Sequence, residues 1–161
     1  MKNLNAALEQ QLKLLTELHG LLKRETDELS EIHVDAMAEI NIQKEDLTER
    51  IAAHAAVFRA AIQEFTSSEG LSSAATLGEL AARCSQKGNR DIARLHAELN
   101  TTASQIKELL GLNHDIATRF AASVGNSLDF IARIINQNST YGASGSYQQR
   151  PSGAVLINRE A

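Results

Sequence analysis

Residues 4–36 read LNAALEQQLKLLTELHGLLKRETDELSEIHVDA, and their periodicity decides the fold. Apolar residues recur at alternating spacings of four and three, and only Gln11 and Glu25 interrupt the series with polar side chains. The seam positions are Leu4, Leu8, Gln11, Leu15, Leu18, Leu22, Glu25, Leu29, Ile32 and Ala36. A heptad pattern of this kind predicts a long helix that packs one stripe against another helix.

The pattern loosens after Ala36, where the spacing approaches an eleven-residue repeat and predicts weaker supercoiling. The seam continues through Ile40, Gln43, Leu47, Ile51, His54, Phe58, Ile62 and Phe65. Residues 31–35, EIHVD, form a softer point at which Asp35 could cap a new helix. We expect a kink or a short break there.

A second periodic arm follows a polar loop. Residues 66–73, TSSEGLSS, are small and polar and predict the loop. Thr76 and Glu79 have the spacing of a capping box that starts the next helix. A weak patch at Gly88 and Asn89 interrupts the second seam, whose positions are Leu77, Leu80, Cys84, Leu95, Leu99, Thr102, Ile106, Leu109, Asn113, Ile116, Phe120, Val124, Ser127, Ile131 and Ile134.

These patterns predict an all-α protein, an elongated antiparallel helical hairpin or bundle of long helices over residues 1–138. The arms would cover residues 3–66 and 76–138, joined by a loop at 67–75. If each arm also breaks near its middle, at Asp35 and at Gly88 or Gly111, the same sequence makes a shorter four-helix bundle. Residues 139–161 have a polar, Gly- and Ser-rich composition, which predicts a flexible C-terminal tail.

Composition argues against several classes of function. The net charge is −4 without a basic stripe, which disfavours nucleic-acid binding. No run of 18 apolar residues occurs, so we expect no membrane insertion. The N-terminal residues lack the apolar core of a signal peptide, and a single cysteine, Cys84, cannot form an internal disulfide. A cytoplasmic location is therefore expected.

The sequence offers no arrangement typical of catalysis, so we predict no enzyme, no cofactor and no metal site. No two histidines have the spacing of zinc or di-iron ligands on a helix; the five are His19, His33, His54, His96 and His114. The residues around His96 do not resemble those of a phosphotransfer histidine. We expect His54 to be a partly buried polar seam residue, and Cys84 to be a small core residue.

Several polar residues occupy seam positions: Gln11, Glu25, Gln43, Thr102 and Asn113. Their usual role is to fix register or orientation, and the alternative is a seam soft enough to open for a partner.

The end of the second arm is unusually rich in apolar residues. Phe130, Ile131, Ile134 and Ile135, with Leu128, make a stripe wider than one seam needs. Such width indicates either a surface for another protein or self-association into a homo-oligomer. Beyond the predicted tail linker, residues 154–157, AVLI, are apolar and β-prone. Val155, Leu156 and Ile157 are therefore either a second partner-binding element or a terminus that docks on its own bundle.

Three stretches resemble the FlgN family of flagellar export chaperones. The first arm has Leu18, Leu21, Leu22, Glu25 and Leu29, followed by Asp35 and by Lys44 ahead of Leu47. The second arm has Leu112, Asn113 and His114, and then Asn126. Residues 140–145, TYGASG, resemble the family's Tyr-Gly-x-x-Gly element just past the last helix, which is the most diagnostic piece.

The resemblance implies a cytoplasmic chaperone that binds the C-terminal helical regions of hook-associated proteins, the proteins of the hook–filament junction. Such a chaperone prevents their premature polymerisation and delivers them to the type III export gate. Client binding would fall on Phe130, Ile131, Ile134 and Ile135. Tyr141, with Gly142 and Gly145, would dock on the cytoplasmic domain of the export gate. The alternative is a self-associating coiled-coil scaffold.

Overall fold

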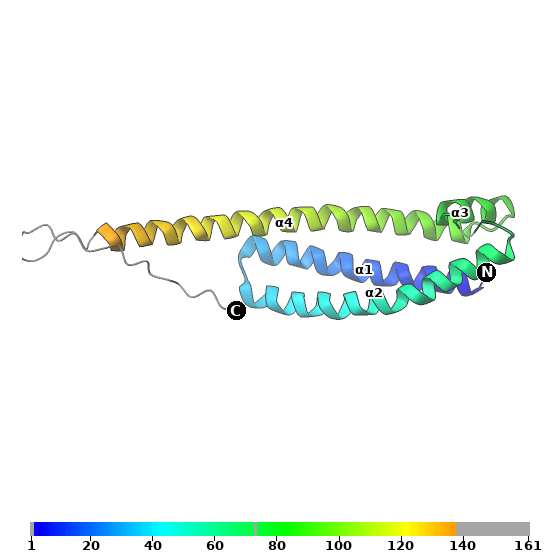
Figure 1. Cartoon of the computed structure of the whole chain (residues 1–161), viewed down its shortest axis with the longest axis horizontal. Helices are drawn as coiled ribbons and strands as arrows, with labels where there is room; N and C mark the ends of the chain where they lie inside the picture. The colour runs from blue at the N-terminus through cyan, green and yellow to red at the C-terminus, as the bar shows by residue number, and fades with distance from the viewer. Residues whose placement is uncertain (1, 73, 138–161) are drawn as a thin grey trace, which may run out of the picture. The chain divides into compact units, whose positions relative to one another are not determined.

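The computed structural model describes residues 2–72 and 74–137 and consists of helices and their connections (Figure 1). The helices are α1 (Lys2–Glu31), α2 (Val34–Ser68), α3 (Leu77–Gln86) and α4 (Asp91–Gln137). The predicted all-α class with long helices is confirmed. The chain divides into two units, residues 1–117 and 118–161, and α4 belongs to both. The residues predicted as a tail, 139–161, lie outside the described part of the chain.

The soft point in the first arm is a complete break between α1 and α2. Ile32 has φ 60°, in the left-handed region that a β-branched residue rarely adopts. His33 stands at the N-cap of α2 without a side-chain cap hydrogen bond. Asp35 lies in the first turn of α2, so the expectation that Asp35 caps this helix is wrong. Its carboxylate is instead placed where the helix dipole favours negative charge.

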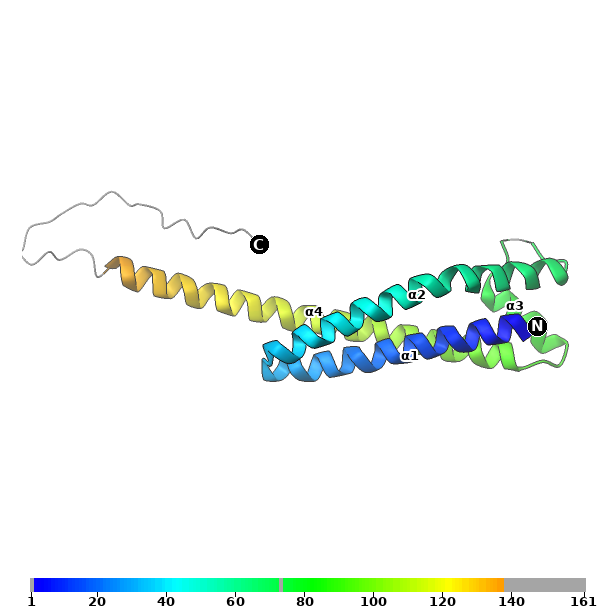
Figure 2. The same ribbon diagram turned by 90° about the horizontal axis from the view of Figure 1, so that it is seen from below.

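Because of this break, α1 and α2 lie side by side and antiparallel (Figures 1 and 2). The first arm therefore breaks near its middle, as in the shorter bundle that the sequence leaves open, whereas the second arm divides unequally into a short α3 of 10 residues and a long α4 of 47 residues. The first part of α4 runs along α1 within residues 1–117. The helix α3 is short and lies at the end where the N-terminus and the end of α2 also lie.

The connections before and after α3 contain the glycines and the capping box that the sequence predicts there. The helix α2 ends two residues later than predicted, at Ser68, and Gly70 then takes φ 64°. The capping box is confirmed: the Glu79 amide donates to Thr76 Oγ1 at 3.2 Å, and the Thr76 amide donates to Glu79 Oε2 at 2.7 Å. The second break falls at Gly88, with φ 86°, and not at Gly111, which is inside α4.

The main core of residues 1–117 forms where the start of α1, the end of α2, α3 and the start of α4 meet. Its buried members are Leu4, Ala7, Leu8, Ala61, Phe65, Leu80, Ala81, Cys84, Ile92, Leu95 and Leu99. Ala7 and Leu14 are buried although neither is on the predicted seam, whereas the seam residue Leu15 is only partly buried. The buried face of α1 is thus broader than a heptad stripe, because α1 packs against more than one helix.

Candidate partner-binding surface

Three helices contribute to a buried polar cluster within residues 1–117. Asn113 of α4 donates from Nδ2 to the Leu22 carbonyl at 3.0 Å and to Glu25 Oε2 of α1 at 2.9 Å. Thr26 Oγ1 donates to Asn113 Oδ1 at 2.6 Å. Lys44 Nζ of α2 donates to Glu25 Oε1 at 2.5 Å. We call Glu25, Lys44 and Asn113 the polar cluster.

The polar cluster contains two of the polar residues that the sequence places on the seams. Glu25 and Asn113 are buried, and both oxygens of the Glu25 carboxylate accept a hydrogen bond. A buried charge of this kind is tolerated only when it is paired and hydrogen-bonded. The cluster therefore constrains where α1, α2 and α4 lie along one another, because a shift of one helix would leave these groups without partners.

The helix α4 changes character from Phe120 onward. Up to Asn113 its seam residues Leu95, Leu99 and Ile106 are buried, but every large apolar side chain from Phe120 to Ile135 is exposed. These exposed residues are Phe120, Val124, Leu128, Phe130, Ile131, Ile134 and Ile135. Apolar side chains gathered on one short helical segment are typical of a surface that binds a protein.

The exposed residues of α4 divide into two sets around the helix axis. At about 100° per residue, five of them lie within about 40° of Val124. We call this set the α4 apolar face: Phe120, Val124, Leu128, Ile131 and Ile135. Phe130 and Ile134 lie about 120° and 80° to one side of Val124, and we call them the flank. The four predicted client-binding residues therefore include two of the apolar face and both of the flank.

The predicted site residues beyond α4 lie outside the described residues. These are the export-gate residues Tyr141, Gly142 and Gly145, and the apolar residues Val155, Leu156 and Ile157. The structure brings together only the α4 members of the predicted surface, Phe130, Ile131, Ile134 and Ile135, which share less than two helical turns.

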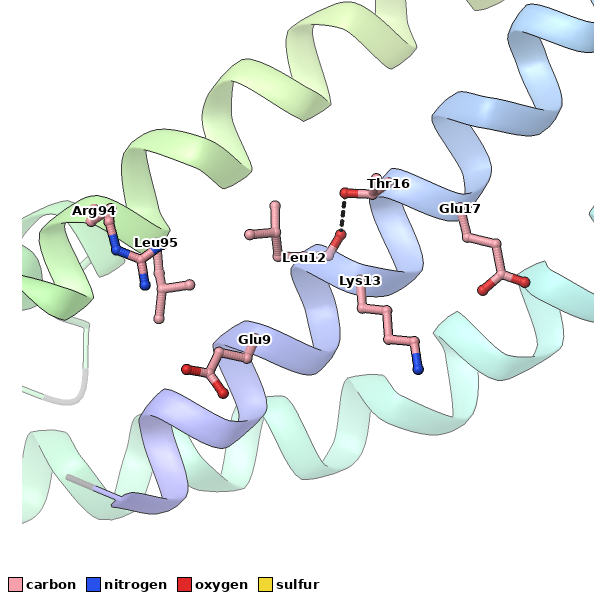
Figure 3. Close-up of a pocket in the computed structure, with 7 residues that line it drawn as sticks. All are labelled: Glu9, Leu12, Lys13, Thr16, Glu17, Arg94 and Leu95. Atoms are coloured by element: carbon pink, nitrogen blue, oxygen red, sulfur yellow. Dashed lines mark hydrogen bonds between the residues drawn. The ribbon is translucent and has the colours of Figure 1, made fainter.

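An open groove between α1 and the start of α4 is a feature that the sequence did not reveal (Figure 3). Leu12 and Leu95 line it from the two helices, with charged residues of both signs beside them. Its lining residues are Glu9, Leu12, Lys13, Thr16, Glu17, Arg94 and Leu95. Leu12 was missed because it is off the heptad seam. The groove brings no set of polar groups to one point, as a small-molecule site would.

Beside this groove, a bidentate ion pair links α1 to α2. Arg50 donates to Glu17 Oε1 at 2.8 Å and to Glu17 Oε2 at 2.9 Å. These hydrogen bonds hold the pKa of Glu17 below its usual value and raise the pKa of Arg50. Such pairing supports the antiparallel placement of α1 on α2.

Cys84 and His54 lie in surroundings typical of residues that stabilise the fold. Cys84 is buried in the core, and burial, followed by the charge of Glu69, raises the pKa of its thiol, which disfavours the reactive thiolate. His54 Nε2 lies 3.0 Å from the Ala7 carbonyl of α1, as expected of a partly buried seam residue. Within residues 2–72 and 74–137, no three His, Cys, Asp or Glu side chains are grouped so that they could hold a metal ion.

No helix in the described part of the chain is both long and apolar enough to cross a bilayer.

Comparison with known proteins places the chain in one family. The family model described as FlgN protein matches residues 1–149, which is most of the chain and includes all four helices and the Tyr141 element. No curated protein and no solved structure matches the chain. A family match of this extent agrees with the resemblance carried by the leucine-rich first arm, Asn113 and the Tyr-Gly element. The chain belongs to the FlgN family of flagellar export chaperones.

Proposed function

We propose that this chaperone binds the C-terminal helical regions of hook-associated proteins in the cytoplasm, prevents their premature polymerisation and delivers them to the type III export gate. The observation that carries the proposal is the exposed apolar segment of α4 in a chain of this family. Protein termini that polymerise through helices expose apolar stripes before assembly. A helix with its own exposed stripe can cover them in the meantime.

The proposed client surface consists of the α4 residues Phe130, Ile131, Ile134 and Ile135, with Val155, Leu156 and Ile157 as a second element. The four α4 residues are between 43% and 65% exposed, so they are accessible to a partner without unfolding of the helix. Large apolar side chains on adjacent turns are the usual anchors when one helix binds another.

The proposed gate contact is separate from the client surface and consists of Tyr141, Gly142 and Gly145. Its support is the position of the TYGASG element just after α4, together with the family match that reaches residue 149. A tyrosine flanked by glycine offers an aromatic anchor with little side-chain entropy to lose.

Client binding is tested with a purified hook-associated protein and with a version that lacks its C-terminal segment. We expect binding to the first and none to the second, as measured by calorimetry. Equal binding to both, or binding to neither, would contradict the chaperone proposal and favour a scaffold. Ile134→Asp should weaken binding at least tenfold. Ile42→Asp is the matched control, because Ile42 is an equally helical isoleucine, on α2 and 68% exposed.

Gate docking is tested by Tyr141→Ala, with Tyr147→Ala as the matched control. We expect Tyr141→Ala to leave client binding intact and to reduce export of the client in cells, while Tyr147→Ala changes neither. A loss of client binding in Tyr141→Ala would place this tyrosine in the client surface instead.

A further inference from the structure

We propose that in the absence of a client two copies of this chain pair through the α4 apolar face, with the two α4 segments antiparallel. The five residues that form this face are Phe120, Val124, Leu128, Ile131 and Ile135, and all are at least 41% exposed. The occupant that we propose for this face is thus a second copy of the same surface, brought there by a twofold axis.

The first support is the spacing of the face, which suits pairing of straight helices. The steps from Phe120 to Ile135 are four, four, three and four residues. Phe120 and Ile131, and likewise Val124 and Ile135, are eleven residues apart. An eleven-residue repeat corresponds to about 3.67 residues per turn, so the stripe drifts by only about 20° over one repeat, and two such short stripes can remain in contact along their length.

The second support is that the face is complementary to itself when it is reversed. Around a twofold axis between Ser127 and Leu128, Phe120 lies level with Ile135 of the other copy, and Val124 lies level with Ile131 of the other copy. The Phe120–Ile135 and Val124–Ile131 layers then join apolar side chains, and at the axis Leu128 lies level with the small Ser127 of the other copy, which leaves room for close approach. Such reciprocity is what an isologous dimer requires.

The third support is the placement of charge. The charged residues between Phe120 and Ile135 are Asp129 and Arg133. At about 100° per residue they lie about 140° and 180° from Val124, on the opposite side of the helix. Arg119, just before the segment, is about 140° away as well. Pairing therefore buries no charge, and no ion pair is needed to compensate one.

The area of the face places the pair in a size class of interfaces. A large side chain exposes on the order of 200 Å² when fully accessible. With exposed fractions between 41% and 65%, the five residues offer at most about 500 Å² on each helix. Two copies would bury at most about 1,000 Å² in total, which is below the size of a typical stable interface and typical of a reversible one. We therefore expect a weak dimer in the micromolar range, which a client can displace.

The consequence for a client rests on the proposed function. Ile131 and Ile135 belong both to the α4 apolar face and to the proposed client surface, so dimer and client compete. Phe130 and Ile134 form the flank, about 120° and 80° from Val124, and remain outside the helix pair. This difference allows self-pairing and client binding to be tested separately on the same helix.

Sedimentation velocity of the full chain without any client is the first test. The chain has a mass of 17.5 kDa, and we expect a concentration-dependent shift toward twice that value. Val124→Asp should raise the dissociation constant at least tenfold, whereas Phe130→Asp, a larger apolar loss on the flank, should leave it unchanged. A chain that is monomeric up to millimolar concentration overturns the proposal, as does equal loss in both variants. Circular dichroism confirms that each variant is helical.

Disulfide crosslinking tests the orientation, in a background in which the buried Cys84 is replaced by serine. Ser127→Cys should crosslink to itself, and Arg119→Cys, on the opposite side, should not. A mixture of Phe120→Cys and Ile135→Cys chains should give the heterodimer, while Phe120→Cys alone should give none. Self-crosslinking of Phe120→Cys would mean parallel helices and would overturn the antiparallel arrangement. Titration of a client into the Val124→Asp chain, which should not self-associate, then measures client binding separately from self-pairing.

Discussion

Asn113 and Glu25 lie 2.9 Å apart, amide nitrogen to carboxylate oxygen, across the contact between α4 and α1, and both are buried. The Asn113 amide is oriented by its nitrogen, which donates to two oxygen acceptors, the Leu22 carbonyl and the Glu25 carboxylate. The pair therefore has a defined geometry that a shift of either helix would destroy.

Replacement of Asn113 should destabilise the bundle in a way that depends on the new side chain. Asn113→Leu removes both donated hydrogen bonds and should cost about 1–3 kcal/mol of unfolding free energy. Asn113→Asp should cost more at neutral pH, since two carboxylates would share a buried site. That penalty should shrink in acid, where a protonated carboxyl group can donate a hydrogen bond. Urea denaturation at both pH values measures the difference.

The control for this comparison is Asn126→Asp, which makes the same change at an exposed position of α4. Its effect should stay within about 0.5 kcal/mol. If Asn113→Asp were equally mild at neutral pH, the polar cluster would contribute little to stability.

Replacing all three residues of the polar cluster at once tests whether the cluster fixes the register of the helices or instead weakens their contact so that a partner can open it. A chain with Glu25→Leu, Lys44→Leu and Asn113→Leu should be as stable as the parent or more so, because apolar substitutes avoid the desolvation cost of buried charges. If the cluster fixes the register of the helices, this variant should populate more than one packing arrangement. The NMR spectrum of its backbone amides should then show more than one set of resonances. A single, unchanged set of resonances would assign the register to the apolar core alone.

The core and the exposed part of α4 should respond very differently to the same truncation. Leu8 is fully buried, so Leu8→Ala should cost about 2–5 kcal/mol. Leu128 is 58% exposed, so Leu128→Ala should change the unfolding free energy by less than about 0.5 kcal/mol. Chemical denaturation below the dimerisation range measures both. A large loss in Leu128→Ala would show that this residue is packed in solution.

The heptad pattern was sufficient to predict long helices, while the small polar residues 66–73 predicted the loop before α3 and the spacing of Thr76 and Glu79 predicted the capping box. Periodicity reports which residues face a neighbour, but it does not report which neighbour. The burial of Leu14 rather than Leu15 therefore could not be predicted, because it depends on the packing of α1 against several helices. The reversal at Ile32 was predictable only as a weak point, since β-branched residues give no signal for a left-handed turn.

The functional surface was predictable to a different degree. The sequence predicted a partner-binding surface because the apolar stripe is wider than one seam needs at Phe130, Ile131, Ile134 and Ile135. All four residues are exposed. The sequence pattern treated Phe120 and Val124 as further seam positions of the same kind as Leu95 and Leu99. Only the structure distinguishes the buried part of that seam, Leu95 and Leu99, from the exposed part, Phe120 and Val124.

Acid should weaken the link between α1 and α2 at Glu17. Arg50 lowers the pKa of Glu17 in the folded chain, so the carboxylate stabilises the fold above its unfolded pKa of about 4.3. That contribution is lost as the pH falls through the lower folded value. Glu17→Gln should therefore lower the Tm slightly at pH 7, and the difference from the parent should vanish near pH 2. A difference that is constant over this range would exclude the ion pair as its cause.

The capping box at the start of α3 should matter more than its exposure indicates. Thr76 Oγ1 accepts from the Glu79 amide at 3.2 Å. Because α3 has only 10 residues, few other hydrogen bonds within the helix can compensate for the loss of this cap. Thr76→Ala should therefore cost about 1 kcal/mol. Because α3 contributes Leu80, Ala81 and Cys84 to the core, this loss should appear in global unfolding and not only in fraying of α3.

Thr101→Ala is the matched control for the cap, since Thr101 is an exposed threonine inside α4 whose hydroxyl donates to the Ala97 carbonyl at 3.0 Å. Alanine is the better helix former at such a position, so Thr101→Ala should be neutral or stabilising by a few tenths of a kcal/mol. Urea denaturation should thus give opposite or clearly unequal effects for two identical substitutions. Equal effects would mean that the hydrogen bond of Thr76 contributes nothing beyond helix propensity, and that α3 is held by its core residues alone.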